Sequence, residues 1–272
     1  TNSGPICEYA LKRKIAVFAE KLPSHELACT RRLAALAAES GVPVRIDYIF
    51  PELHTFREAR KLITDGALGR LRLVELEWVF ESHDHRNNLQ SWKTDAAQGG
   101  GVLRHFLVHS LYYLEWLFGR IVTVAGVLQP DGVQETGDAH ASILLTTASQ
   151  TTISVVASNA LSYEQRHSVS AWGQRGFLHL HNCGSDPVRD FELSADFGAG
   201  KILRVAERDH LQVPPAQDSR VGPSRRLSAS LIEQIRLGGT TGKPDFSDAL
   251  RAHELIEAIS ESNNNGRTIH VG

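Results

Sequence analysis

The stretch "RLRLVELEWVFE" at residues 70–81 alternates apolar and charged residues with a period of two. Such alternation predicts a β-strand with one apolar face and one polar face. Val74, Leu76 and Trp78 fall on the apolar face, and Glu75 falls on the polar face. Because helices must cover the apolar face, these residues predict a sheet that is packed on one side.

Short strand-like runs continue downstream of a helical stretch, and no helix separates them. They are rich in β-branched residues and end at turns, which is the pattern of an antiparallel sheet. Helical periodicity returns at about residues 226–237 and 247–262, and a last strand is predicted at 267–271. Residues 207–226 hold three prolines, which predicts a long exposed loop. The predicted strands are "IVTVAGVL" (121–128), "ASILLTT" (141–147), "TTISVVAS" (151–158), "HSVSAW" (167–172) and "GFLHLH" (176–181).

The region upstream of residue 70 follows a different pattern, in which strands and helices alternate. We expect a buried strand at 14–21 and a helix that starts at Ser24 and ends before Gly41. A second strand at 42–50 and an amphipathic helix at 56–66 follow. Strand, helix, strand and helix in this order predict parallel α/β winding, so the fold class is α/β.

The composition is that of a globular chain with an ordinary charge balance. The 272 residues are 42% hydrophobic and 22% charged, enough for one large or two modest domains. The 29 basic and 31 acidic residues nearly cancel, and no run approaches about 20 apolar residues, so we expect neither nucleic acid nor membrane as a partner. The three cysteines form no CxxC pair, which predicts free thiols and a cytoplasmic location.

A helix predicted within residues 99–119 carries two histidines, His105 and His109, on an otherwise apolar sequence. At about 100° per residue these histidines share one stripe with Tyr112 and Trp116, while leucines occupy the opposite stripe. The helix therefore has one purely apolar face and one face suited to chemistry.

Other motif candidates fail on inspection. "GGTTGKP" (238–244) lacks the first glycine and the Ser or Thr of a phosphate-binding loop, and reads as a turn before a helix. "HLHNC" (179–183) alternates histidine with leucine as the polar face of a strand does. "HDH" (83–85) is expected in a polar loop, and the GxGxxG fingerprint is absent.

Four segments in order resemble the Gfo/Idh/MocA family of oxidoreductases, the group of glucose–fructose oxidoreductase and inositol dehydrogenase. The resemblance covers nearly the whole chain. It implies that residues 1–47 are the remainder of a Rossmann domain binding NAD or NADP, and that residues 48–272 form an α/β domain with a large, mostly antiparallel open sheet. This second domain would bind a carbohydrate-like small molecule and form a homo-dimer or homo-tetramer. The four segments are "FAEK" (18–21), "GVPVRIDYIFPELHTFREARKLITDGALGRL" (41–71), "SWKTD" (91–95) with "GGGVL" (99–103) and "YLEWLFG" (113–119), and "FSDALRAHELIEAISESNNNGRTIHV" (246–271).

The same resemblance implies that the sequence begins late. "TNSGPICEYAL" (1–11) is similar to the family's Thr-Pro-Asn loop and the helix after it, which follow the glycine-rich turn. The sequence also contains no methionine. We therefore expect that residues upstream of Thr1, and some methionines, are missing from it.

The family's catalytic positions correspond to Lys21, His109 and His105, where His105 replaces a family aspartate. Side chains four apart on a helix meet, so His105 is expected to tune or relay protons to His109. An aspartate would raise the basicity of His109, whereas a neutral His105 can only form a hydrogen bond. The resemblance further places Thr1, Asn2, Glu20, Lys21 and Tyr48 beside the cofactor and Trp92, Lys93, Asp95 and His109 beside the substrate, with Lys93 replacing an arginine.

Three functions remain open at this point. The first is an NAD(P)-dependent dehydrogenase or reductase that acts on a CH–OH group of a sugar, nucleotide sugar or cyclitol. The second is a catalytically silent dinucleotide-binding sensor or regulator of the same fold, which the histidine at 105 favours. The third is a metal-dependent lyase or hydrolase in which His105 and His109 bind a metal with His83 or His85, although the HExxH glutamate is absent.

Overall fold

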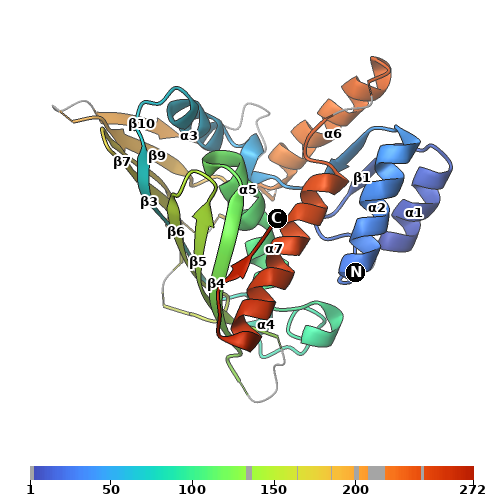
Figure 1. The fold of residues 1–272 in the computed structure, drawn as a ribbon, viewed down its shortest axis with the longest axis horizontal. Coiled ribbons are helices and arrows are strands. Elements are labelled where there is room, and N and C mark those ends of the chain that lie inside the picture. The colour runs from blue at the N-terminus through green and yellow to red at the C-terminus, as the bar shows by residue number, and fades with distance from the viewer. Residues whose placement is uncertain are drawn as a thin grey trace.

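A computed structural model describes residues 3–132, 137–163, 165–184, 186–198, 202–207, 218–239 and 242–272. Figure 1 shows a large sheet on one side, a small N-terminal α/β unit on the other, and helix α7 between them. The α/β class and the large sheet predicted from the sequence are confirmed. None of the described helices is both long enough and apolar enough to cross a membrane.

The N-terminal unit consists of two short parallel strands and the helices that precede each of them. Gly41 adopts the left-handed conformation (φ 65°) and ends the second helix, as predicted. The start of that helix was predicted wrongly, because the Ser24 hydroxyl accepts a hydrogen bond from the Glu26 amide in a turn that comes first. The elements are α1 (Gly4–Lys12), β1 (Val17–Ala19), α2 (Leu27–Ser40) and β2 (Val44–Ile46), with Val17 opposite Val44.

The large sheet has nine strands within the described residues, in the order β10-β9-β8-β7-β3-β6-β5-β4-β11. Every neighbouring pair is antiparallel except β3 and β6, which are parallel. Two of its strands, β9 and β10, were not predicted, and each is only five residues long. The strands are β3 (Leu71–Val79), β4 (Ile121–Gln129), β5 (His140–Thr147), β6 (Thr152–Ser158), β7 (Arg166–Gly173), β8 (Phe177–Asn182), β9 (Glu192–Asp196), β10 (Ile202–Ala206) and β11 (Ile269–His270).

Helices cover the inner face of this sheet and join it to the N-terminal unit. Val74 and Leu76 on β3 are buried there, as the alternation predicts. Helix α7 packs on β4, α2 and α5, and α6 packs on β2. The covering elements are η1 (Phe50–Glu52), α3 (His54–Thr64), α5 (Val108–Phe118), α6 (Val221–Arg236) and α7 (Phe246–Asn265).

Two local predictions are corrected, and a third is confirmed where it is described. Residues 221–226 belong to helix α6 rather than to an exposed loop, because Leu227 and Leu231 bury one side of that helix; residues 208–217 lie outside the described part. Residues 83–86 form a one-turn helix, α4 (His83–Arg86), which the Ser82 hydroxyl caps. The predicted turn before α7 is present where it is described, with Asp245 and Asp248 forming a capping box.

The outer face of the sheet combines polar and apolar areas. Leu144, Val156 and Val127 lie on β5, β6 and β4 and are 51%, 46% and 56% exposed. Farther along the same face, His179 and His181 on β8 stack with ring centroids 4.7 Å apart. The prediction that these two histidines lie on the polar face of a strand is confirmed, because the leucines that alternate with them are buried.

Candidate active site

A cleft of about 1570 Å³ lies where the N-terminal unit faces the large sheet. Glu20, Lys21 and Asp47 line it from the ends of β1 and β2. Because carboxyl ends of parallel strands are where open α/β sheets bind ligands, this position alone marks the cleft as a candidate site.

Lys21 reaches across the cleft to the segment that carries His105. Its Nζ lies 3.3 Å from His105 Nδ1 and also donates a hydrogen bond to the His105 carbonyl oxygen. Burial lowers the pKa of Lys21 to about 8, with Glu20 raising it and Lys93 lowering it further. Lys21 therefore exchanges a proton near neutral pH, which an exposed lysine does not.

His105 lies on a π-helical turn, Leu103–Leu107, that precedes α5. The uniform α-helix predicted within residues 99–119 is therefore wrong in this part. A π turn changes the hydrogen-bonding pattern of the backbone, and such turns are frequent at functional sites. Here the His105 carbonyl accepts from Lys21.

His105 is a neutral partner of Lys21 rather than of His109. Burial and the ammonium groups of Lys21 and Lys93 lower its pKa to about 3. Since an ammonium only donates, His105 Nδ1 accepts and its ring proton resides on Nε2. Among the described residues no hydrogen bond joins His105 to His109, so the expected relay between them is replaced by a contact with Lys21.

His109 stands in the first turn of α5 and lines the same cleft. Burial lowers its pKa well below the ordinary value, so the ring is neutral. Its Nδ1 is buried and has no hydrogen-bond partner among the described residues. Phe50 packs edge-on against it with centroids 5.7 Å apart. A buried ring nitrogen without a hydrogen-bond partner is uncommon in a protein core.

Tyr48 lies behind His109 and does not line the cleft. It is 1% exposed, stacks on Tyr112 with centroids 4.4 Å apart, and meets the His109 ring edge-on at 5.9 Å. The direct cofactor contact predicted for Tyr48 is therefore not available in this structure. Its side chain supports the orientation of His109 instead.

Asp47 is a cleft residue that the sequence reading missed. It follows β2, and the Ser224 hydroxyl of α6 lies 2.9 and 3.1 Å from its two carboxylate oxygens. Burial raises the pKa of Asp47 to about 6. Arg220 lines the same end of the cleft and pairs with Asp218 at 2.6 Å. The position directly after a parallel strand was the available signal for Asp47.

Aromatic side chains form the part of the cleft contributed by the sheet. Trp78 on β3 stacks on His167 of β7, with centroids 4.1 Å apart and planes 2° apart. His167 Nε2 lies 2.8 Å from the Tyr113 hydroxyl. Phe80 and Phe106 meet edge-on at 4.7 Å. Trp78, Phe80, Phe106 and His167 line the cleft, and no sequence motif identified them as site residues.

The predicted substrate-side segment divides into three different environments. Trp92 lines the cleft and packs edge-on against His105 with centroids 5.2 Å apart. Lys93 lines a side chamber of about 280 Å³. Asp95 lines neither cavity, and its carboxylate caps the 3-10 turn Ala96–Gln98 through the Ala97 amide at 2.9 Å. Asp95 is thus placed to shape the loop, and its contact with substrate stays a prediction.

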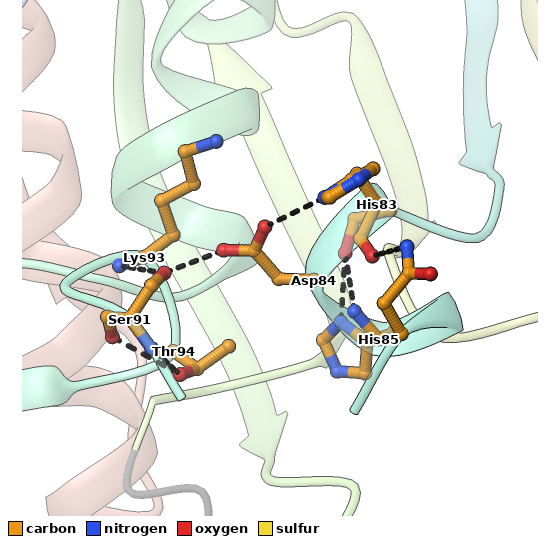
Figure 2. A network of polar contacts seen from close by, with 8 residues as sticks. His83, Asp84, His85, Ser91, Lys93 and Thr94 are labelled. Carbon is orange, nitrogen blue, oxygen red and sulfur yellow. Dashed lines mark hydrogen bonds and ion pairs between the residues drawn. The ribbon is translucent and has the colours of Figure 1, made fainter. Parts of the chain in front are cut away.

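Ser91 and Asp84 hold the Lys93 loop against helix α4, as Figure 2 shows. The Ser91 hydroxyl donates to Asp84 and accepts from the Lys93 amide at 3.1 Å. The Ser82 hydroxyl lies 2.8 Å from Nδ1 of the His85 ring. These contacts fix the floor of the side chamber.

The remaining predictions concern residues 1–2 and metal ions. Thr1 and Asn2 lie outside the described residues. Across the described ranges, no group of three His, Cys, Asp or Glu side chains is arranged to hold a metal ion. The metal-dependent alternative therefore has no support from the arrangement of His83, His85, His105 and His109.

The cleft suits the reacting end of a nicotinamide dinucleotide. The carboxyl ends of β1 and β2 open into it, a lysine with pKa about 8 lies inside it, and His109 lines it. Glu20 and Lys21 are the predicted cofactor-side residues that line it.

Comparison with known proteins finds a matching domain model and similar oxidoreductases. Residues 56–179 match the model of the GFO/IDH/MocA C-terminal domain. An uncharacterized oxidoreductase of Synechocystis sp. is 28% identical over 174 residues, 60% of this chain and 46% of that protein. The chain thus spans less than half the length of this relative.

Two further proteins are similar over nearly the whole chain. A dTDP-3,4-didehydro-2,6-dideoxy-alpha-D-glucose 3-reductase of Streptomyces violaceoruber is 26% identical over 272 residues, 95% of this chain and 73% of the reductase. Levoglucosan dehydrogenase, solved in complex with NADH and levoglucosan, superposes with a TM-score of 0.83 over 99% of this chain and 77% of that chain, at 17% identity. At this identity the superposition shows a shared fold.

Proposed function

Because the chain carries a Gfo/Idh/MocA C-terminal domain and belongs with this family of oxidoreductases, we propose that it is an NAD(P)-dependent dehydrogenase or reductase acting on a CH–OH group of a sugar, nucleotide sugar or cyclitol. The observation that carries the proposal is the contact of Lys21 with His105 inside the cleft, at the carboxyl end of a parallel strand. The NADH complex of levoglucosan dehydrogenase supports the cofactor class. The proposal includes both NAD and NADP as the cofactor.

In this proposal Lys21 moves the proton. Oxidation of an alcohol removes a hydride from carbon and a proton from oxygen, and bound NAD(P)⁺ supplies the hydride acceptor. The neutral amine of Lys21 accepts the hydroxyl proton, since its pKa of about 8 matches the working pH. His105 orients that amine through Nδ1, and His109 offers a hydrogen bond to the substrate oxygen.

Lys21 suits the role of proton acceptor better than His109 does. Burial lowers the pKa of His109 well below the ordinary value, so the ring binds a proton weakly. A base with so low a pKa gives little driving force for proton removal. His109 is therefore assigned to positioning and hydrogen bonding in this proposal.

Dinucleotide titration and a substrate panel test the proposal on the full-length protein. We expect NAD⁺ or NADP⁺ to bind at millimolar concentration or below in calorimetry, and at least one sugar or cyclitol to be oxidised with production of NAD(P)H absorbance. Absence of dinucleotide binding at millimolar concentration contradicts it.

A silent sensor is the second candidate, favoured by one observation: a neutral histidine at 105 replaces the family's aspartate. Such a protein binds dinucleotide but turns over no substrate of the panel. Activity that is lost in Lys21→Met excludes this candidate.

We further propose a homo-oligomer that packs through the outer face of the large sheet. Leu144, Val156 and Val127 are about half exposed there, and a contiguous exposed apolar area usually marks an interface. Light scattering should give a dimer or tetramer mass at micromolar protein, and Leu144→Glu should shift it toward the monomer. A monomer mass for the unmodified protein contradicts this.

The cytoplasmic location predicted from the cysteines remains a proposal. Cys7, Cys29 and Cys183 are all free, which is consistent with a reducing compartment. Fractionation of cells that express the tagged protein tests it.

A further inference from the structure

The side chamber joins the main cleft at the proposed reaction centre. His105, Phe80 and Phe106 line both cavities, so a molecule bound beside Lys21 has direct access to the chamber. Helix α4, the Lys93 loop and the residue that follows β6, Asn159, form its other walls. No part of the proposed proton transfer uses this space.

Asn159 leaves its amide group unused in this wall. The side chain is 3% exposed, and its Oδ1 is buried without a hydrogen-bond partner in the part of the chain that the structure describes. Among the described residues its backbone hydrogen-bonds to Ala139 and Ser82, whereas its amide nitrogen makes no hydrogen bond. An amide carries two donors and an acceptor, and rotation by 180° exchanges the positions of O and N. A buried amide without partners costs free energy unless a ligand pairs with it.

Lys93 brings a second unused donor. Its backbone amide is held by Ser91, but within the described residues its ammonium forms no hydrogen bond or ion pair. Figure 2 shows the side chain of Lys93 extending away from the Asp84 carboxylate, whose contacts are with Ser91 and His83.

The charges around the chamber nearly cancel. Arg220 pairs with Asp218, and Glu81 pairs with Arg86 at 2.9 Å. Lys93 is then opposed by Asp84, whose pKa is lowered first by the hydrogen bond from Ser91 and also by the Lys93 ammonium. A chamber with balanced charge and mixed donors and acceptors favours a neutral polar ligand over an ion.

We propose that the side chamber binds the hydroxyl groups of a neutral polyol arm of the substrate, through the Asn159 amide and the Lys93 ammonium. The inference rests on the proposed function, because it names the substrate class of that site. Phe80 and Phe106 contact the apolar C–H groups of the same arm where the cavities meet. At about 280 Å³ the chamber accommodates such an arm of a few carbon atoms, whereas a nucleotide of a nucleotide sugar has to lie in the larger cleft.

Crystals of the full-length protein soaked in glycerol or in D-xylose test the inference directly. We expect density for the polyol in the chamber, with hydroxyl oxygens within hydrogen-bond distance of Asn159 and Lys93. An empty chamber at saturating polyol overturns it. D-glucuronate is the charged comparison: if it occupies the chamber and the neutral sugars do not, the chamber binds a carboxylate and the inference is wrong.

Variants give a solution readout by ligand-observed NMR titration with D-xylose. Asn159→Leu should weaken D-xylose binding about tenfold, since one polar contact is lost. Asn159→Asp retains an acceptor and should stay within a few-fold for D-xylose while rejecting D-glucuronate. The matched control is Asn264→Leu, at an exposed position near the end of α7, which should leave the affinity unchanged.

The dinucleotide titration separates this inference from the proposed function. If NAD(P)⁺ binds but Asn159→Leu, folded as judged by its melting temperature, binds D-xylose as the unmodified protein does, the chamber assignment fails and the dehydrogenase proposal stands. If the polyol occupies the chamber and no dinucleotide binds, the reverse holds.

Discussion

The two walls of the cleft differ in the chemistry that they present. The N-terminal wall is defined by Glu20, Lys21 and Asp47. Two of these residues titrate near neutral pH, Lys21 with a pKa of about 8 and Asp47 with a pKa of about 6. The sheet wall, defined by Trp78, Phe80, His105, His109 and His167, offers rings that stay neutral, because burial lowers the pKa of both His105 and His167 to about 3.

This difference follows from how each wall is built. Residues at the carboxyl ends of β1 and β2 leave the sheet with their side chains free to enter the cleft. The rings of the sheet wall come from a continuous core, where desolvation suppresses charge. We therefore expect changes at Lys21 and at the two histidines, His105 and His109, to alter rate or pH dependence. Changes at the hydrocarbon rings of the sheet wall, such as Phe80, should alter binding.

The largest effect is expected for Lys21→Met, which removes the proposed proton acceptor but retains most of the side-chain volume. General-base catalysis contributes about 10²- to 10⁴-fold, so kcat should fall by that factor while the dinucleotide Kd changes little. Steady-state kinetics and calorimetry measure the two quantities. The control Lys12→Met changes an exposed lysine of α1 that pairs with Glu8 and should be silent.

His109→Leu should lower kcat by less, about tenfold. It removes the proposed hydrogen bond to the substrate oxygen and leaves the base, Lys21, in place. The same kinetic assay measures it. If His109→Leu loses as much as Lys21→Met and also removes the rise of the rate with pH, the roles of the two residues are reversed.

His105→Asp should move the pH profile rather than abolish activity. In the oxidation direction the rate rises with pH as Lys21 loses its proton, with a midpoint near pH 8. A carboxylate about 3.3 Å from the amine favours the charged form, so the midpoint should rise by about one to three pH units. The pH dependence of kcat/KM measures this shift, and an unchanged midpoint argues against the Lys21–His105 contact.

Phe80→Leu probes the sheet wall by itself. Loss of the aromatic face should raise KM by about three- to tenfold, and kcat and the pH midpoint should not move. A change in the pH midpoint would show that the two walls do not act separately. Leu89→Ala, at a half-exposed position outside both cavities, serves as the control.

The smallest effect is expected at the ion pair between Arg104, which lines the cleft, and Glu257 of α7, whose charged atoms lie 2.7 Å apart. Hydrogen bonds from His253 and Arg104 lower the pKa of Glu257 to about 2. A carboxyl whose folded pKa is depressed stabilises the protein above its ordinary pKa, and this contribution is lost as the pH falls from about 4.5 to 2. Because the carboxylate is partly exposed, Glu257→Gln should lower the free energy of unfolding by about 1 kcal/mol or less at pH 7. Urea denaturation at pH 7 and pH 3 measures this difference, which should shrink at the lower pH.

Local periodicity predicted most of the elements, and the family resemblance pointed to several residues of the cleft. The alternation at 70–81 is that of β3, and the strands and helices around it lie close to their predicted places. Lys21, Glu20, Trp92, His105 and His109 all line the cleft. These features depend on neighbours a few residues away along the chain, or on motifs that resemble a family, and so they are encoded locally.

Tertiary structure alone decided which of these residues meet. His105 contacts Lys21, 84 positions away, rather than His109 one turn along, because a π turn replaces the regular helix and burial keeps the ring neutral. Tyr48 and Asp95 do not line the cleft. The Tyr48 ring stacks on Tyr112, and the Asp95 carboxylate caps a 3-10 turn. The parallel pairing of β3 with β6 also joins distant segments. Pairing between distant segments is set by which apolar surfaces can be buried together, and local periodicity carries no information about that choice.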